Sequence, residues 1–238
     1  MRYTSEVKKP SLVPAGEPAV ASVAALIGDP ARAAMLCALM DGGELTASDL
    51  ARRGAVAPNA ASAHLAKLVA GGLLAVRASG RQRLFRLASA PVGHAIEALT
   101  AIAPPARIVA LSQSRISEEL REARTCYDHL AGRLGVGVTE SLARRGILIV
   151  EADDYALSRK GAAVLADLGV DLDGARASRR RFAHQCLDWS ERRPHVAGAL
   201  GAAICDAFLA RRLVERRKGN RSLRVTPAGM EWMISWFR

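Results

Sequence analysis

The pattern of apolar and polar positions along the chain is mostly helical, with apolar residues three and four positions apart. The first predicted helix spans 18–27, and one face of it carries Val20, Val23, Ala24 and Ile27. The second follows Asp29, which suits the N-cap position, with Pro30 as its first residue. Its apolar stripe consists of Ala33, Leu36, Cys37 and Met40. On this interpretation Cys37 is a small buried side chain.

Two further helices are predicted between residues 45 and 72, separated by a three-residue turn. Thr46 and Asp49 have the spacing of a capping box, and Gly54 ends the helix that they begin. Pro58 suits the first position of the next helix, which closes at the glycine pair 71–72. The pattern therefore predicts a helix-turn-helix.

A short hairpin is predicted directly after this pair of helices. Its strand candidates are 73–76 and 84–87, and Ser79-Gly80-Arg81-Gln82 between them has turn chemistry. The stretch from Leu50 to Ile96 contains no Asp or Glu, although its basic residues are Arg52, Arg53, Lys67, Arg77, Arg81, Arg83 and Arg86. An acid-free stretch with an arginine at a hairpin tip is typical of phosphate binding.

The second helix of the predicted pair carries short polar side chains suited to a DNA groove. Short side chains allow close approach to bases, and Asn59 can pair with an adenine edge. The predicted DNA contacts are Thr46, Pro58, Asn59, Ala60, Ser62, Ala63, His64, Lys67, Arg77, Arg81, Gln82 and Arg83. The alternative is a small helical module whose basic face is merely solvated.

The segment 45–87 reads LTASDLARRGAVAPNAASAHLAKLVAGGLLAVRASGRQRLFRL. It resembles the winged helix-turn-helix of the ArsR/SmtB transcriptional repressors, most specifically in HLAKLVAGGLL and GRQRLFRL. The resemblance covers roughly Pro18 to Ala103. It implies a homodimer, built by the first helix and by a helix over 91–103, that binds a palindromic operator in double-stranded DNA.

The resemblance also directs attention to two metal sites that occur in members of that family. One uses carboxylate and His ligands on the last helix, and the other uses Cys residues before the recognition helix. Here the corresponding stretches are GELTASDLA and PVGHAIEALTAIAP, which contain no Cys and only His94. Neither family metal site is therefore expected, and His94 is interpreted as a residue of the helix face.

The chain divides into three predicted regions. We expect residues 1–16 to form a flexible tail, 17–103 the DNA-binding and dimerisation domain, and 104–238 a sensor region that begins with a long helix from Ala106 to about Ala131. The net charge of +11 indicates an anionic partner. No apolar run reaches membrane-spanning length and the N-terminus lacks a signal-peptide pattern, so we expect a cytoplasmic protein with no membrane partner.

The C-terminal half contains an internal repeat. HLAGRLG at 129–135 matches HVAGALG at 195–201, and each copy continues with a helix, two short strands and a helix capped by Ser or Thr. This order is again that of a winged helix. The predicted fold is therefore mainly α with small β-hairpin wings: one winged helix-turn-helix, followed by two degenerate winged-helix-like repeats.

Side chains that could bind a metal ion or react with an oxidant lie just before each repeat unit. Cys126 and Cys186 occupy related places, and His129 and His195 lie near them in sequence. If the units pack about a pseudo-twofold axis, these residues form a site for a soft ion such as zinc, cadmium, lead or arsenite. Two close thiols alone would instead sense oxidants. The third interpretation is plain packing, with Asp128 and Asp188 capping helices or pairing with arginine.

No catalytic signature accompanies these residues: the chain has no Gly-x-Ser-x-Gly, His-Glu-x-x-His, Gly-Lys-Ser/Thr or Cys-x-x-Cys motif. We therefore expect a repressor that an inducer releases from its operator, and not an enzyme. The first alternative is a non-specific or architectural nucleic-acid-binding protein without ligand sensing. The second is an enzyme with a DNA-binding leader, which the absent motifs disfavour.

Overall fold

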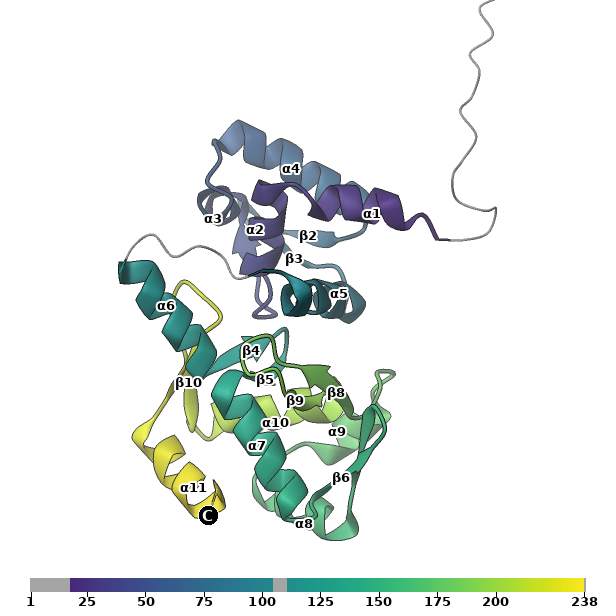
Figure 1. Cartoon of the computed structure of the whole chain (residues 1–238). Helices are drawn as coiled ribbons and strands as arrows, with labels where there is room; N and C mark the ends of the chain where they lie inside the picture. The colour runs from purple at the N-terminus through teal and green to yellow at the C-terminus, as the bar shows by residue number, and fades with distance from the viewer. Residues whose placement is uncertain (1–17, 105–110, 238) are drawn as a thin grey trace, which may run out of the picture.

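The computed structural model describes residues 18–104 and 111–237, arranged as two halves with helix α5 between them (Figure 1). The predicted tail at 1–16 and the residues 105–110 between the halves lie outside the described residues. The N-terminal half contains, in order, α1 (Val20–Ile27), α2 (Pro30–Ala38), β1 (Leu45–Thr46), α3 (Ala47–Arg53), α4 (Pro58–Ala70), β2 (Leu74–Ser79), β3 (Gln82–Leu87) and α5 (Ala90–Ile102).

Local hydrogen bonds explain where these helices begin. The Asp29 side chain accepts from the backbone N–H of Arg32 at 2.9 Å and caps α2. Thr46 and Asp49 form both arms of the predicted capping box at the start of α3. Each such cap satisfies N–H groups that the first turn of a helix leaves unpaired. The predicted helix-turn-helix is thus confirmed, with α3 and α4 as its two helices.

The hairpin is longer than predicted because pairing continues to the turn. Ser79 pairs with Gln82, and Gly80 between them has a φ of +58°, a left-handed conformation that glycine adopts without strain. Strand β1 adds to the other side of the hairpin, which gives an antiparallel sheet of order β1-β3-β2. The winged helix-turn-helix predicted from the sequence is therefore present.

The core of this half lies between α2, α3, α4 and the sheet. Its fully buried members include Leu50, Leu65, Leu68 and Phe85. Of the apolar stripe predicted for α2, Leu36 and Met40 are buried as expected and Ala33 is half-buried, while Met35 and Leu39 are buried in addition. Cys37 is exposed, and its prediction as a buried side chain was wrong.

The C-terminal half contains, in order, α6 (Leu111–Glu122), β4 (Arg124–Cys126), β5 (His129–Ala131), α7 (Gly132–Arg144), β6 (Leu148–Glu151), β7 (Asp154–Leu157), α8 (Arg159–Asp167), α9 (Leu172–Ala177), β8 (His184–Leu187), β9 (Pro194–Ala197), α10 (Gly198–Ala210), β10 (Val214–Arg216), β11 (Leu223–Val225) and α11 (Pro227–Phe237). The prediction that this first helix reaches Ala131 was wrong. It ends at Glu122, because the next residues pair as a β4–β5 hairpin whose turn contains Tyr127 at a φ of +59°.

The internal repeat is present as two copies of the same element order: β5-α7-β6-β7-α8 and β9-α10-β10-β11-α11. The predicted caps also form, since Ser158 Oγ accepts from Gly161 N–H at 2.9 Å and Thr226 Oγ1 from Gly229 N–H at 3.0 Å. Strands β6-β7-β8-β9 form one sheet, whereas β4-β5 and β10-β11 form separate hairpins.

One glycine in each copy explains part of the sequence match. Gly132 and Gly198 open α7 and α10 with φ values of +75° and +82°. A Cβ at either position would lie 2.6 Å from a backbone carbonyl oxygen, of Arg121 or Arg181 respectively. Only glycine combines this conformation with this close approach. The two helices that it opens contribute much of the apolar core of this half, including Leu142, Leu200 and Phe208.

Within the described ranges, no single helix is both long enough and apolar enough to cross a membrane.

Candidate functional site

Helix α4 presents most of the predicted DNA contacts to solvent. Pro58, Asn59, Ser62, Ala63 and Lys67 are exposed, and Ala60 is half-buried. Asn59 Oδ1 accepts from the N–H of Ala60 at 2.8 Å, and Ser62 Oγ donates to the carbonyl of Pro58 at 3.0 Å. The side chains on this face are short, so a nucleic-acid surface can approach the helix closely.

Two of the predicted contacts are engaged within the protein. His64 is partly buried, and its Nδ1 lies 3.5 Å from Arg32 Nη1 and 3.7 Å from Asp29 Oδ1. Thr46 belongs to the capping box of α3, where its hydroxyl bonds to Asp49. These contacts attach both residues to neighbouring elements, which leaves the exposed face of α4 centred on Asn59.

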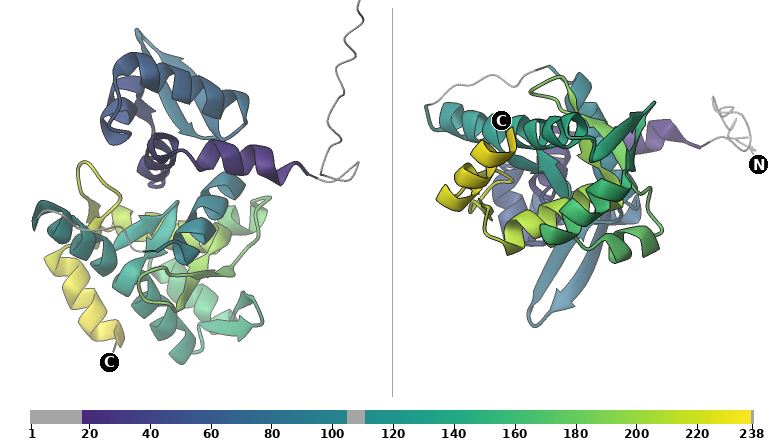
Figure 2. Two further views of the ribbon diagram at one scale, coloured as in Figure 1. Left: turned by 45° about the horizontal axis from the view of Figure 1, so that its top comes forward. Right: turned by 90° about the horizontal axis from the view of Figure 1, so that it is seen from below.

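The hairpin β2–β3 carries the predicted arginines at its surface and projects from the body of the molecule (Figure 2). Arg81 at the tip, Gln82 and Arg83 are exposed. Arg77 is paired instead, because its Nε lies 2.8 Å from Glu44 Oε1, and this hydrogen bond lowers the pKa of Glu44. Glu44 lies just before the acid-free stretch, so the sequence did not indicate that Arg77 has an acidic neighbour.

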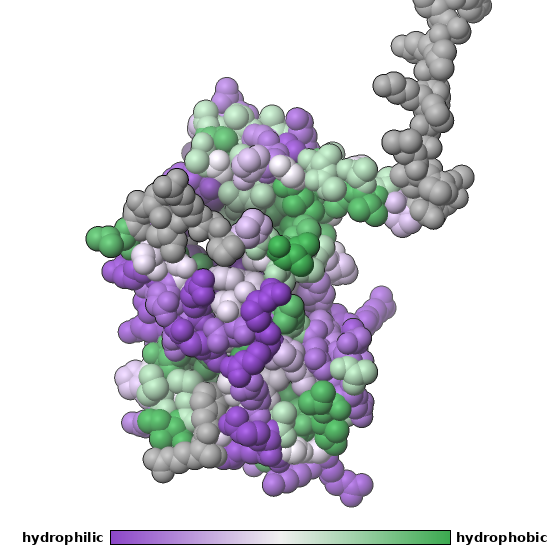
Figure 3. All heavy atoms as spheres, in the orientation of Figure 1, coloured by the Kyte–Doolittle hydropathy of each residue, from purple (hydrophilic) through white to green (hydrophobic). Residues whose placement is uncertain are grey.

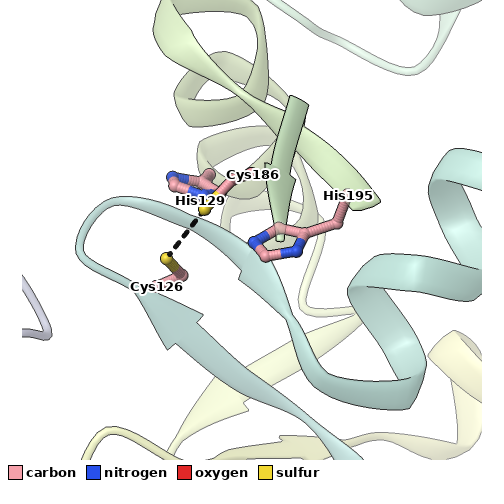
Figure 4. Close-up of side chains that lie close together, drawn as sticks. All are labelled: Cys126, His129, Cys186 and His195. Carbon is pink, nitrogen blue, oxygen red and sulfur yellow. Dashed lines mark hydrogen bonds between the residues drawn. The ribbon is translucent and has the colours of Figure 1, made fainter. Parts of the chain in front are cut away.

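The structure brings Cys126, His129, Cys186 and His195 together, and we call these four residues the thiol–imidazole cluster (Figure 4). One potential ligand atom from each lies within 4.8 Å of the others. The two Sγ atoms are 3.7 Å apart, and the two imidazole centroids are 5.0 Å apart. Cys126, His129 and His195 are fully buried, whereas Cys186 is half-buried.

Two hairpins build the cluster in the same way. Cys126 on β4 lies opposite His129 on β5, and Cys186 on β8 lies opposite His195 on β9. Each hairpin immediately precedes the helix of one repeat copy. The repeat therefore places one Cys–His pair in each copy, and the packing of β5 near β9 brings the pairs together.

The cluster separates charge among its members. Hydrogen bonding from the Cys126 thiol, together with the imidazoles of His129 and His195, lowers the pKa of Cys186 despite burial. Burial and the bond to Cys186 raise the pKa of Cys126. For His129, burial opposes protonation, but the hydrogen bond to Asp128 and the proximity of the Cys186 sulfur raise the pKa to about 9. Burial lowers the pKa of His195. These shifts favour the thiolate form of Cys186 and the protonated ring of His129.

An aspartate supports each histidine from behind. Asp128 Oδ1 lies 3.3 Å from His129 Nδ1 and also pairs with Arg180. Asp188 Oδ2 lies 3.7 Å from His195 Nδ1 and 2.8 Å from Arg124 Nη2. Both aspartates pair with arginine, as the packing interpretation expected. The same arrangement is common behind metal-binding histidines, where a carboxylate fixes the ring orientation.

Several polar atoms of the cluster lack partners. His129 Nε2 and both ring nitrogens of His195 are buried without a hydrogen-bond partner in the described part of the chain. Buried polar groups are nearly always satisfied, so such atoms point to a missing ligand. Two thiolates on one tetrahedral zinc ion would lie about 3.8 Å apart, given Zn–S distances of about 2.3 Å. The observed sulfur separation and the two-Cys, two-His donor set both fit such an ion.

A buried ionic network joins this cluster to α5 of the N-terminal half. Glu97 on α5, which is 2% exposed, accepts from Arg221 at 3.0 Å and lies 3.9 Å from Arg124 Nη2. Arg124 in turn bonds to Asp188 behind His195. The sequence analysis did not identify Glu97 or Arg124, because nothing local marks a buried ion pair. Arg221 belongs to the same network.

Comparison with known proteins finds several that are similar to the N-terminal half. A family profile for a helix-turn-helix domain matches residues 27–77. Reduced HlyU from Vibrio cholerae is 28% identical, with 36% of this chain and 90% of HlyU covered and a TM-score of 0.33. The homodimeric winged helix-turn-helix domain of Mb0332 from Mycobacterium bovis, described as a possible ArsR-family regulator, is 25% identical, with 35% and 76% covered and a TM-score of 0.32.

The fold and the exposed face of α4 thus define a DNA-binding winged helix-turn-helix transcriptional regulator, as the sequence predicted. A relative extends the likeness over most of the chain. The uncharacterized HTH-type transcriptional regulator YdfF of Bacillus subtilis (strain 168) is 40% identical over 212 residues, which cover 89% of this chain and 94% of YdfF. The chain belongs to this family of HTH-type transcriptional regulators, and the likeness includes its C-terminal half.

Proposed function

We propose that the protein is a dimeric repressor of ArsR type that leaves a palindromic operator when a soft, thiol-binding ion occupies the thiol–imidazole cluster. The observation that carries this proposal is the convergence of two cysteines and two histidines, with unpartnered ring nitrogens, in the interior of the C-terminal half. Thiolates bind zinc, cadmium, lead and arsenite in preference to hard ions.

Dimerisation is supported by apolar surface that the single chain leaves uncovered. Helix α1 is rich in Val, Ala and Ile, yet none of its residues is buried, and Val20 is 70% exposed. Leu99 and Ile102 on α5 are exposed as well. Figure 3 shows the apolar residues along α1 on one face of the molecule. Exposed apolar patches of this kind typically mark protein interfaces, so we assign α1 and α5 to the contact between two copies.

DNA recognition is assigned to α4 and the hairpin. In a symmetric dimer, two copies of α4 would enter successive major grooves of a palindromic site. Asn59 and its short neighbours would contact base edges, while Arg81 and Arg83 would contact phosphates. A non-specific architectural protein would use the same basic surface but show no sequence preference, so selection of binding sites from random DNA separates the two functions.

We assign the coupling between ion binding and DNA binding to the buried ionic network that includes Asp188, next to His195. An ion on His195 would strengthen its interaction with Asp188, because metal ligation increases the acidity of the second ring nitrogen. Arg124 contacts both Asp188 and Glu97 of α5. A change in the interaction between His195 and Asp188 therefore reaches the helix that we assign to the dimer contact. An ion that binds better to the DNA-free conformation then lowers operator affinity by linkage.

A thiol switch is the second candidate, supported by the 3.7 Å separation of the two Sγ atoms. A disulfide requires a sulfur separation of about 2.05 Å, so oxidation needs only a small approach. The ion and the oxidant would act on the same residues but leave different products.

The test is operator binding by the wild type and by Cys126→Ser/Cys186→Ser, titrated with zinc, cadmium, arsenite and peroxide. We expect a soft ion to weaken operator binding by about 10-fold or more in the wild type, within the range typical of allosteric coupling, and to have no effect on the double variant. Full operator affinity of the wild type under all four additions, or an unchanged response of the double variant, would refute the sensor role.

A further inference from the structure

Three consecutive arginines and the start of α5 enclose a cavity of about 370 Å³ between the two halves, which we call the arginine cavity. Ala90, Pro91 and His94 line it from α5, while Arg179–Arg181 and His184 line it from the C-terminal half. Among the described residues, no Asp or Glu lines it. No member of the thiol–imidazole cluster lines it either, so this cavity is a separate and basic space.

The charges of the three arginines are only partly compensated. Arg180 forms an ion pair with Asp128, and Arg181 Nε lies 2.7 Å from Asp154 Oδ1. Arg179 is exposed and has no ion pair within the described part of the chain. Three guanidinium groups thus have two carboxylate partners, both outside the lining of the cavity, and the remaining positive charge favours an anion.

Two buried nitrogen atoms of residues that line the cavity lack a hydrogen-bond partner. They are Arg180 Nη2 and His94 Nε2, neither of which is bonded to any described residue. Asp128 accepts from Nη1 of Arg180, so Nη2 is left as a free donor. Buried polar groups are nearly always satisfied, so both atoms point to a ligand that carries acceptor oxygens. Guanidinium groups bind such oxyanions through paired hydrogen bonds.

The position of the cavity favours a small ligand over the phosphates of DNA. Strand β3 runs from Gln82 at the hairpin tip to Leu87, a length of roughly 17 Å, and α5 begins beyond its far end at Ala90. The cavity is therefore remote from Arg81, which we assign to the DNA backbone. Its volume is near the lower end of the range of about 300–1,000 Å³ that is typical of pockets for organic ligands.

We propose that the arginine cavity binds a compact phosphomonoester, at a site distinct from the proposed ion sensor. The phosphate oxygens accept from Arg179, from Arg180 Nη2 and from His94 Nε2, and the organic group lies against Ala90 and Pro91. A phosphomonoester fits better than a carboxylate, because its three terminal oxygens and greater charge can satisfy all three donors. The ligand contacts both halves and so links α5 to the C-terminal half.

The test is isothermal titration calorimetry of the full chain at constant ionic strength, with phenyl phosphate, inorganic phosphate and benzoate as probes. We expect phenyl phosphate to saturate one site per chain, and benzoate, with the same ring but one charge, to bind about 10-fold more weakly or less. Arg179→Ala and Ala90→Glu change the cavity from opposite halves. Each should weaken phenyl phosphate binding about 10-fold or more, the first by loss of a charged donor and the second by repulsion.

Matched variants separate this site from general electrostatics. Arg176→Ala removes an exposed arginine of α9 outside the cavity and should leave the affinity within about two-fold of the wild type. Ala90→Gln has the shape of Ala90→Glu without its charge and should weaken binding less. Cys126→Ser/Cys186→Ser should bind phenyl phosphate like the wild type, because the sensor cysteines do not line the cavity.

Four results would overturn the inference. They are the absence of saturable phenyl phosphate binding, equal affinities for phenyl phosphate and benzoate, equal losses in Arg179→Ala and Arg176→Ala, and displacement of phenyl phosphate by random duplex DNA. The last result would assign these arginines to DNA. None of the four bears on ion binding by the cysteines, which the operator titrations test separately.

Discussion

The two halves of the molecule differ in how many polar side chains they bury. The N-terminal half exposes Asn59 and Arg81 to solvent, and Glu97 on α5 is its one buried charged residue among those that the structure describes. The C-terminal half buries Arg124, Asp188 and His195 completely. Burial of charge is costly unless partners compensate for lost water, so a chain carries such residues inside only with a dense network or a ligand. This difference supports the proposal that the first half binds DNA and the second a small ligand.

The largest effect is expected at Asp188. Its carboxylate accepts hydrogen bonds from Arg124, from the N–H of Gly132 and from the Ser190 hydroxyl. Asp188→Asn removes the carboxylate charge that lies closest to the buried Arg124, and we expect a loss of about 3–5 kcal/mol in the free energy of unfolding. Urea denaturation measures it. The control, Glu140→Gln, removes an exposed pair with Arg193 and should cost less than about 1 kcal/mol. Equal costs for the two variants would show that the buried network is not special.

The next largest effect is expected from substitutions in the exposed apolar surface of the N-terminal half. Charges at Val23 and Leu99, as in Val23→Asp/Leu99→Asp, should prevent association of two copies, because a buried unpaired carboxylate opposes the contact. Analytical ultracentrifugation should then report monomers, and operator affinity should fall on the order of 100-fold as one half-site is lost. Val150→Asp, on exposed β6, is the control. A dimer that survives in the double variant would place the interface elsewhere.

Substitutions in the proposed DNA-binding surface should have two kinds of effect, one on sequence selectivity and one on overall affinity. Asn59→Ala should relax selectivity at one base pair by about 1–3 kcal/mol, because we assign this exposed residue of α4 to a contact with a base edge. Arg81→Ala should weaken all sequences equally and reduce the salt slope by about one, as expected for a phosphate contact. Binding to operator and random DNA at several salt concentrations measures both. Unchanged selectivity of Asn59→Ala would remove α4 from base recognition.

The smallest expected effect concerns the connection between the halves. Glu97→Gln keeps the shape of the side chain but removes the charge that faces Arg124 and Arg221. We expect zinc affinity to change little, while the ratio of operator affinities without and with zinc falls by about 0.5–2 kcal/mol. Glu119→Gln, which also faces an arginine but lies on α6, serves as the control. An unaltered ratio in Glu97→Gln would show that coupling follows another route.

Sequence and structure agree best where signals are local. The capping box of Thr46 and Asp49, the proline at the start of α4 and the turn at Gly80 each act within a few residues, and all were predicted. The buried positions of the second helix were predicted only in part, since apolar residues occupy more than one face of that helix and only its packing decides which are buried. Cys37 was misplaced for this reason.

The candidate site was predictable only in part. The internal repeat placed Cys126 and Cys186 at related positions, and the structure brings their sulfurs together. The β4–β5 hairpin was missed because residues 123–126 are buried on both sides, so they lack the alternation that marks a half-exposed strand. The pairing of Arg124 with Asp188 joins residues 64 positions apart, and no sequence spacing indicates it.

The most direct test of the central claim is a native mass spectrum of the full chain with added zinc, recorded for the wild type and for Cys126→Ser/Cys186→Ser. The account predicts a wild-type dimer that carries one zinc ion per chain, and a double variant that remains dimeric without zinc, because thiolates supply much of the binding energy of such sites. A wild type that binds no zinc, or a double variant that binds as much as the wild type, would contradict it.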